Sequence, residues 1–250
     1  MHTSFRHHLP KRLILCAAVL GITALTACGK GSAPADSAAT SGTMGESATD
    51  LAVNLAQLVT QNPDIFGWLY IPETPIDAPL LQSMTGEDTW YLTHDCTGAE
   101  SGTGAMFIEA GNLLDMCDFN TIVNGYGGKG GCFESLWQFA DADYFAGHEQ
   151  FYIVIDGNAL TYEIWTAYER EDTSLLRSYD LTSEEGCTAY LADMQKEQVA
   201  GRAHIRPGWE EGVSTDNFLV TLTATDSAKP GRQFVVQGCL IDDQAGTIRR

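Results

Sequence analysis

The feature that most constrains the fold is a series of short apolar segments separated by turn-forming residues. These segments occupy residues 67–72, 105–109, 120–126, 151–156, 159–168, 218–224 and 233–241. They are rich in β-branched and aromatic residues and are bounded by Gly, Pro, Asn and Asp, which is typical of β-strands. Between two of them, Asp156-Gly157-Asn158 predicts a tight hairpin turn. Many short strands with few helices predict a mainly β protein, either a barrel or a sandwich, with helical insertions.

An amphipathic helix is expected before the first strand. Leu51, Leu55, Leu58 and Val59 fall at helical spacing, and Asn62-Pro63 ends the pattern. We therefore expect the folded domain to begin with this helix and to extend over residues 51–250.

Two further helices are expected as insertions among the strands. One covers residues 133–139. The other follows Thr182 as its N-cap, with Glu185 three residues on completing a capping box, and continues to about Lys196.

The N-terminal 27 residues have the pattern of an export signal. Arg6, Lys11 and Arg12 precede an uncharged apolar run over residues 13–25. This run is shorter than the roughly 20 residues that a membrane span needs. It ends in Leu25-Thr26-Ala27-Cys28, which resembles a bacterial lipobox, so we expect a lipoprotein signal peptide over residues 1–27. The alternative is an ordinary signal peptide with a chance cysteine at Cys28.

Diacylglycerol on the Cys28 thiol would anchor the mature chain, because two acyl chains together hold a protein stably on a membrane. Residues 29–50 are mainly Gly, Ser, Ala and Thr, which predicts a flexible tether over residues 28–50. The expected location is therefore the outer face of the bacterial cytoplasmic membrane, with the lipid as the sole membrane contact.

The charge of the mature chain limits its partners. Removing residues 1–27 takes three of the 14 basic residues and none of the 33 acidic ones, which leaves a formal charge of −22. Such a chain is not expected to bind nucleic acid, and an anionic lipid surface would repel it. A cationic partner that contacts an acidic face is one hypothesis, and a merely solvated surface is the other.

Five cysteines follow Cys28, and an odd number leaves at least one outside any intramolecular pair. They are Cys96, Cys117, Cys132, Cys187 and Cys239. No two have the spacing of zinc ligands, so we expect no structural metal, and we expect no cofactor. One disulfide among the first three is possible.

Several segments, taken in order, resemble the class B sortase family. They are residues 62–72 (NPDIFGWLYIP), 74–82 (TPIDAPLLQ), 91–95 (YLTHD), 104–108 (GAMFI) and 120–123 (NTIV). The resemblance spans nearly all of residues 51–242. It implies a closed sortase-like β-barrel, with the second of these segments as a strand.

The family consists of transpeptidases in which a cysteine thiolate attacks a sorting signal, a histidine serves as acid and base, and an arginine steadies the oxyanion. By the resemblance, the histidine position holds Tyr126 and the cysteine position holds Thr225. The arginine position holds Gln233, with Arg232 directly before it. Because strand side chains alternate between faces, Arg232 is expected to point away from the site unless the strand bulges there.

Other residues are candidates to replace the histidine and cysteine that the resemblance expects. Cys132 follows a glycine-rich loop, residues 127–131, and is a possible alternative nucleophile if that loop brings its thiol to the site. Among the histidines, His94 is expected to be structural, and His148 and His204 are expected at the surface. Asp226, next to Thr225, could orient a hydroxyl, although adjacent strand residues face opposite sides.

The pattern favours a catalytically inactive sortase-like protein that binds a peptide or protein partner at the cell envelope. The alternative is an active cysteine transpeptidase or peptidase that uses non-standard residues. A third hypothesis is a protein that joins a larger envelope complex through its acidic face.

Overall fold

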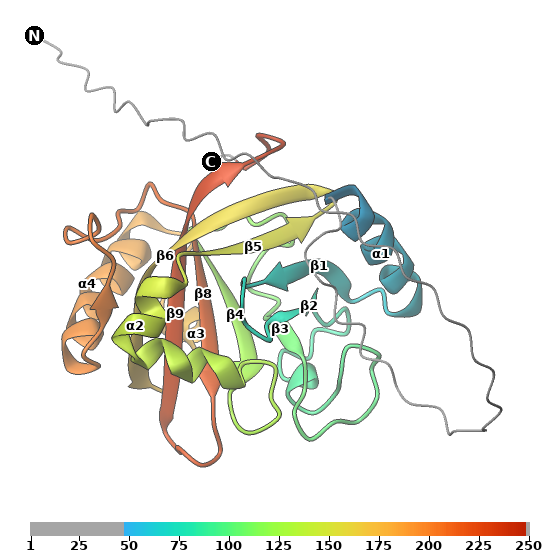
Figure 1. Cartoon of the computed structure of the whole chain (residues 1–250), viewed down its shortest axis with the longest axis horizontal. Coiled ribbons are helices and arrows are strands. Elements are labelled where there is room, and N and C mark those ends of the chain that lie inside the picture. Colours follow the sequence, from blue (N-terminus) through green and yellow to red (C-terminus); the bar gives the residue numbers. More distant parts are fainter. Residues whose placement is uncertain (1–47, 249–250) are drawn as a thin grey trace, which may run out of the picture. The chain divides into compact units, whose positions relative to one another are not determined.

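The computed structural model describes residues 48–248, with side chains from residue 55 onward (Figure 1). The predicted signal peptide, Cys28 and the tether as far as residue 47 lie outside the described residues. The expected N-terminal helix is present as α1 (Ala48–Gln61). It begins three residues before the boundary predicted for the folded domain, and it ends directly before Asn62-Pro63, as the sequence pattern indicated.

The described residues form strands at every position that the pattern predicted, and at two more. The strands are β1 (Ile65–Tyr70), β2 (Asp77–Leu81), β3 (Met106–Ile108), β4 (Asn120–Tyr126), β5 (Gln150–Ile155), β6 (Asn158–Glu171), β7 (His204–Ile205), β8 (Leu219–Thr225) and β9 (Arg232–Asp243). The strand β2 had been expected only from the family resemblance, and the two-residue β7 had not been expected.

Short helices lie between the strands. They are η1 (Trp90–Leu92), η2 (Glu134–Ala140), α2 (Ala142–Gly147), α3 (Leu175–Ser178) and α4 (Glu184–Ala200). The helix predicted over residues 133–139 is the 3₁₀ helix η2. The long insertion helix is α4, but its predicted N-cap is wrong. The Thr182 hydroxyl donates to the Asp180 carboxylate at 2.6 Å, and Ser183 caps the helix by accepting from the Gly186 N–H at 3.1 Å.

Eight of the strands close into a barrel. Their order is β5-β1-β2-β3-β4-β8-β9-β6, and pairing of β5 with β6 completes the ring. The short β7 pairs with β6 beyond the residues that pair with β5. Neighbours are antiparallel except for β2 with β3 and β4 with β8, which are parallel. Figure 1 shows β4, β8 and β9 side by side at the centre of the molecule. The predicted barrel is confirmed, and the sandwich alternative is wrong.

The hairpin turn between β5 and β6 has the predicted residues. Ile155 pairs with Asn158, so Asp156 and Gly157 form a two-residue loop. Both have positive φ, 45° and 75°. This geometry matches the twist of antiparallel strands and favours Asp-Gly.

Apolar side chains fill both the inside of the barrel and part of its outside. On β8, Val220, Leu222 and Ala224 belong to the interior cluster, together with Val123 and Phe234 from the flanking strands. A second cluster lies on the outer face, where Tyr190 and Met194 of α4 cover part of β9. Alternation along β8 therefore directs its threonines outward.

Within residues 48–248, no helix combines the length and the apolar character that a membrane crossing requires.

Candidate functional site

Tyr126, Thr225 and Gln233 lie abreast on three adjacent strands. Tyr126 pairs with Thr225 at the end of the β4–β8 ladder, and Thr225 pairs with Gln233 at the end of the β8–β9 ladder. Their inward-facing neighbours Ala224 and Phe234 pack in the barrel core. All three side chains therefore belong to the outer face of the barrel, at one end of the sheet.

A cavity of about 320 Å³ opens beside two of these residues. Thr225 and Gln233 line it, as do Asn124 and Thr223 from the same outer face. The opposite wall is the segment that follows β6, residues 172–175, which ends on the first residue of α3. Tyr126 is not part of the lining. Its hydroxyl instead forms a hydrogen bond with the Ser227 hydroxyl at 3.1 Å.

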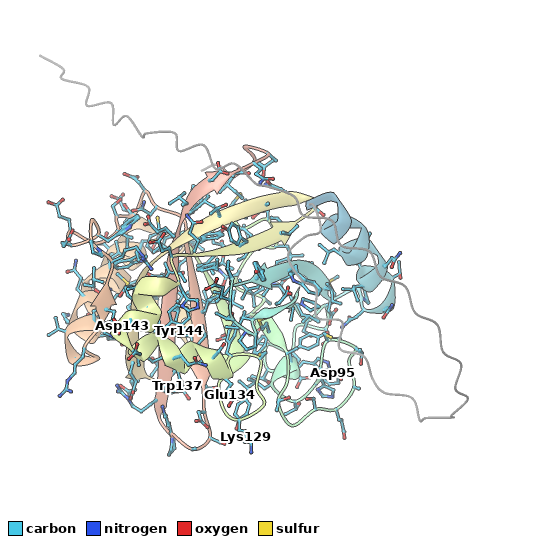
Figure 2. All side chains as sticks on the ribbon, viewed as in Figure 1. Asp95, Lys129, Glu134, Trp137, Asp143 and Tyr144 are labelled. Carbon is cyan, nitrogen blue, oxygen red and sulfur yellow. The ribbon has the colours of Figure 1, made fainter. Side chains whose placement is uncertain are left out.

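The glycine-rich loop, residues 127–131, is closed tightly over Tyr126. The Gly127 N–H donates to the Thr225 carbonyl at 2.6 Å, and the Phe133 N–H donates to the Tyr126 carbonyl at 3.0 Å. A Cβ atom at Gly128 would overlap the Tyr126 hydroxyl. Figure 2 labels Lys129 in this loop together with Glu134 and Trp137 of the following helix η2. The loop is held in one place and is not the flexible carrier that the sequence suggested.

Cys132 is turned away from the cavity. Its side chain packs against the interior cluster, next to the inward side of Gly125 on β4. Burial raises the pKa of its thiol to about 11, so the thiol is protonated at neutral pH. The loop that could have brought this thiol to the site instead holds it on the opposite face of the strand. No disulfide joins Cys96, Cys117 and Cys132.

Gln233 acts as a support for the cavity wall. It is buried, with 3% of its surface exposed, and its Nε2 donates to the carbonyls of Glu171 at 3.3 Å and Thr173 at 3.2 Å. Arg232 pairs with Glu171 in register, without a bulge at this point of the strand. Its guanidinium bonds the Glu169 carboxylate at 2.8 Å and does not line the cavity. The expectation that Arg232 points away from the site agrees with this placement.

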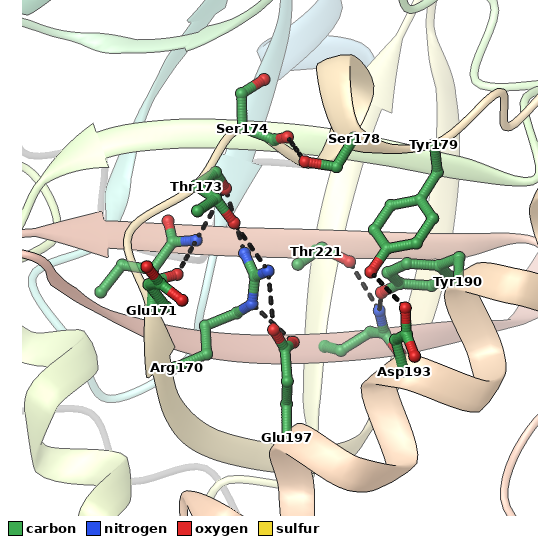
Figure 3. Close-up of polar contacts among 12 residues, drawn as sticks. Arg170, Glu171, Thr173, Ser174, Ser178, Tyr179, Tyr190, Asp193, Glu197 and Thr221 are labelled. Carbon is green, nitrogen blue, oxygen red and sulfur yellow. Dashed lines mark hydrogen bonds and ion pairs between the residues drawn. The ribbon is translucent and has the colours of Figure 1, made fainter.

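An ion pair between the buried Arg170 and Glu197 also holds this wall in place. The Arg170 guanidinium makes two contacts with the Glu197 carboxylate of α4, at 2.7 and 2.9 Å, and also donates to the carbonyl and hydroxyl oxygens of Thr173 (Figure 3). The Arg170 side chain is 2% exposed. Two-point geometry and hydrogen bonds from four of the five N–H donors compensate the buried charge, so this pair fixes the position of the wall. Sequence reasoning missed Arg170, because its partner Glu197 is far away in the sequence, on α4, and only the fold brings the two together.

None of the three histidines in the described part of the chain lines the cavity. The ring of His94 stacks on Trp90 with centroids 3.6 Å apart, and its Nδ1 donates to the Trp90 carbonyl at 2.9 Å, in line with the structural role expected. His148 stacks on Tyr144, and His204 bonds the Ala140 carbonyl at 2.8 Å. Both are half-buried rather than free at the surface, because ring contacts hold them.

Asp226 shapes a turn instead of orienting a hydroxyl. Its carboxylate accepts from the Ala228 N–H at 2.8 Å, and its carbonyl accepts from the Lys229 N–H at 2.8 Å. Among the described residues, no group of His, Cys, Asp and Glu is arranged to hold a metal ion.

The closed eight-stranded mixed barrel with short helices is the sortase fold. It superposes on the crystal structure of Clostridium perfringens sortase B with a TM-score of 0.64 and 22% identity, over 75% of this chain and 99% of that one. A Staphylococcus aureus sortase B–substrate complex gives a TM-score of 0.64 with 19% identity, over 76% and 86% of the two chains.

In sequence, this chain is a homologue of sortase B. It is 28% identical to sortase B of Listeria monocytogenes over 191 residues, which is 75% of this chain and 74% of the relative. No family model matches the chain.

Proposed function

We propose that this protein is an exported, lipid-anchored sortase-like protein of the cell envelope that binds an extended peptide, or a segment of a surface protein, and does not carry out transpeptidation. The observation that carries the proposal is the alignment of Tyr126, Thr225 and Gln233 across β4, β8 and β9. These are the positions at which the family resemblance expects histidine, cysteine and arginine. Here the cavity remains while the three reactive groups are replaced.

The replacements cannot supply the chemistry of a cysteine transpeptidase. A threonine hydroxyl is a weak nucleophile without an adjacent base, and a phenol is a poor base because it keeps its proton at neutral pH. The Gln233 amide carries no positive charge, and its donor group is already bonded to the wall. The nucleophile, the base and the cation that steadies the oxyanion act as one unit, so losing the nucleophile or the base alone already costs about as much activity as dismantling the whole unit.

Peptide binding is supported by the retained cavity and by the relatives. A solved sortase B of this fold is a substrate complex. The location rests on the N-terminal sequence pattern, in which basic residues, a short apolar run and Leu25-Thr26-Ala27-Cys28 occur in the order of a lipoprotein signal.

The alternative is a cysteine transpeptidase or peptidase with Cys132 as its nucleophile. The burial of that thiol, its raised pKa and its position on the inner face of β4 all count against it.

The test is binding without reaction. The protein is titrated with labelled extended peptides, including sorting-signal sequences, and anisotropy reports binding while intact mass reports adducts and cleavage. We expect saturable binding, no adduct and no cleavage. Thr225→Trp should weaken binding by filling the cavity, whereas Thr60→Trp, on the exposed side of α1, should not. Cleavage, or a peptide adduct abolished by Cys132→Ser, would overturn the proposal, as would the absence of binding to any peptide.

A further inference from the structure

The cavity beside Thr225 carries an excess of negative charge. Asp88, Glu109 and Asp172 line it, and among the lining residues they face a single cation, Arg177. The Arg177 side chain is 70% exposed, and its guanidinium lies 3.7 Å from the Asp88 carboxylate. At this distance and exposure the pair is weak, so Arg177 leaves most of the acidic charge unneutralised.

Glu109 is the carboxylate that lies deepest in this environment. It directly follows β3 and is half-buried, and burial, followed by the nearby charge of Asp88, raises its pKa. Its Oε1 accepts a long hydrogen bond from the Asn124 Nδ2 at 3.5 Å. No Lys or Arg of the described residues forms an ion pair with it. The charge of Arg177 acts on Glu109 and lowers its pKa without forming an ion pair, but burial and Asp88 outweigh it, so the carboxylate is only partly compensated.

The neighbouring strands fix the direction of this carboxylate's partner. The Asn124 Oδ1 accepts from the Thr223 hydroxyl at 2.8 Å, which orients the amide so that its Nδ2 faces Glu109. The hydrogen bonds therefore run from β8 through β4 to the end of β3, along the outer face that carries Thr225. The wall opposite is held by Gln233 and Arg170, so the cavity is preformed.

We propose that this cavity takes a cationic side chain of the bound peptide, lysine or arginine, and that Glu109 is the carboxylate that binds it. The inference deepens the proposed function and rests on it. A ligand ammonium or guanidinium would give Glu109 the direct ion pair that no Lys or Arg of the described residues supplies. An acidic side chain at the same place would be repelled by Asp88, Glu109 and Asp172 together.

The test compares peptides that differ in charge at one position. The full-length protein is titrated with fluorescein-labelled pentapeptide pools in which each position in turn carries lysine, norleucine or glutamate among uncharged residues. Norleucine keeps most of the lysine chain and removes the charge. At one position we expect the lysine pool to bind about tenfold more tightly than the norleucine pool, as for one partly buried charged contact. The glutamate pool should bind more weakly than either.

Two variants assign the effect to the cavity. Glu109→Gln keeps the shape and the Asn124 contact, and it should bring the lysine and norleucine pools to within about twofold of each other. Glu185→Gln is the matched control, because it removes one negative charge from an exposed position of α4 that does not line the cavity, and it should leave the preference intact. Arg177→Gln, at an exposed position, should strengthen the lysine preference even if Glu109→Gln fails to fold.

The outcomes separate this inference from the function on which it rests. Pools that bind equally whatever their charge, or a lysine preference that Glu109→Gln leaves unchanged, would overturn the inference and leave peptide binding standing. An unaltered or weaker preference in Arg177→Gln would also count against it. If no pool binds at all, the proposed function fails and the inference fails with it.

Discussion

Thr225 lies directly opposite Tyr126 in the parallel pairing of β8 with β4. Paired strands lie about 4.8 Å apart, so the two side chains leave the same face of the barrel as neighbours. A cysteine and a histidine in these two positions would be close enough to influence each other's ionisation. The backbone arrangement for such a pair is present, and the side chains are not.

Placing a histidine at position 126 and a cysteine at position 225 should create a reactive thiol. In Tyr126→His/Thr225→Cys, the imidazolium next to the new cysteine should lower the pKa of its thiol by at least about one unit compared with Thr225→Cys alone, because an opposite charge within a few ångströms favours the thiolate. Alkylation rates measured against pH report both pKa values, with Cys96→Ala, Cys117→Ala and Cys132→Ala in the background to remove the half-buried thiols that could compete. Identical profiles for the single and double variants would show that the two positions do not communicate.

The buried ion pair of Arg170 with Glu197 should matter for stability, whereas the exposed pair of Arg232 with Glu169 should not. Arg170→Met leaves Glu197 and the Thr173 oxygens without their donor, and we expect a loss of about 3 kcal/mol in the free energy of unfolding. Arg232→Met is the matched control, with an expected loss within about 1 kcal/mol, since both side chains of the Arg232–Glu169 pair are well exposed. Urea denaturation of the two variants measures the difference, and equal losses would contradict the role assigned to Arg170.

The Cys132 thiol should make stability fall at high pH. Its pKa is raised from an ordinary value of 9.0 to about 11 in the folded state. The unfolded chain therefore loses this proton first as pH rises. The stability that the protonated thiol contributes is complete below pH 9 and is lost as pH rises from about 9 to about 11, by up to about 3 kcal/mol.

The measurement is the free energy of unfolding at pH 8, 9, 10 and 11 for the wild type and for Cys132→Ala. Buried tyrosines also titrate in this range, so the quantity of interest is the difference between the two proteins. A gap that stays constant with pH would show that Cys132 is not desolvated in solution.

Gly131 should be intolerant of a side chain. A Cβ atom there would overlap the backbone carbonyl of Tyr126, so Gly131→Ala must displace the loop, and we expect a loss of about 1–3 kcal/mol in the free energy of unfolding. Gly147→Ala is the control, because nothing lies within 4 Å of the added atom at the end of α2. Thermal unfolding compares the two, and a neutral Gly131→Ala would contradict the closed loop.

Much of the secondary structure could be predicted from local pattern. The strand segments, the Asp156-Gly157 turn and the end of α1 before Pro63 depend on neighbouring residues in the chain, and they appear where expected. The N-cap of α4 was wrong by one residue because Asp180, two positions before Thr182, competes for its hydroxyl. Such competition among adjacent polar side chains is not visible in a capping motif alone.

The candidate site could be predicted only in part. The resemblance marked Tyr126, Thr225 and Gln233 individually, but the tight closure of the 127–131 loop and the inward turn of Cys132 follow from contacts that the sequence pattern does not contain. Arg170 and Glu109 were missed for a similar reason. Each is a charged residue at or just after the end of a strand, and its significance comes from partners on other elements.

The sequence by itself determined which segments become strands and helices, because alternation, spacing and turn residues act over a few neighbouring positions. It also carries the export pattern around Cys28. Only the tertiary structure decided which strands become neighbours, because the parallel pairing of β4 with β8 joins segments separated by four helices and three strands. That pairing places Tyr126 next to Thr225 and gathers Asp88, Glu109 and Asp172 around one cavity, since burial and charge proximity are properties of the packed chain.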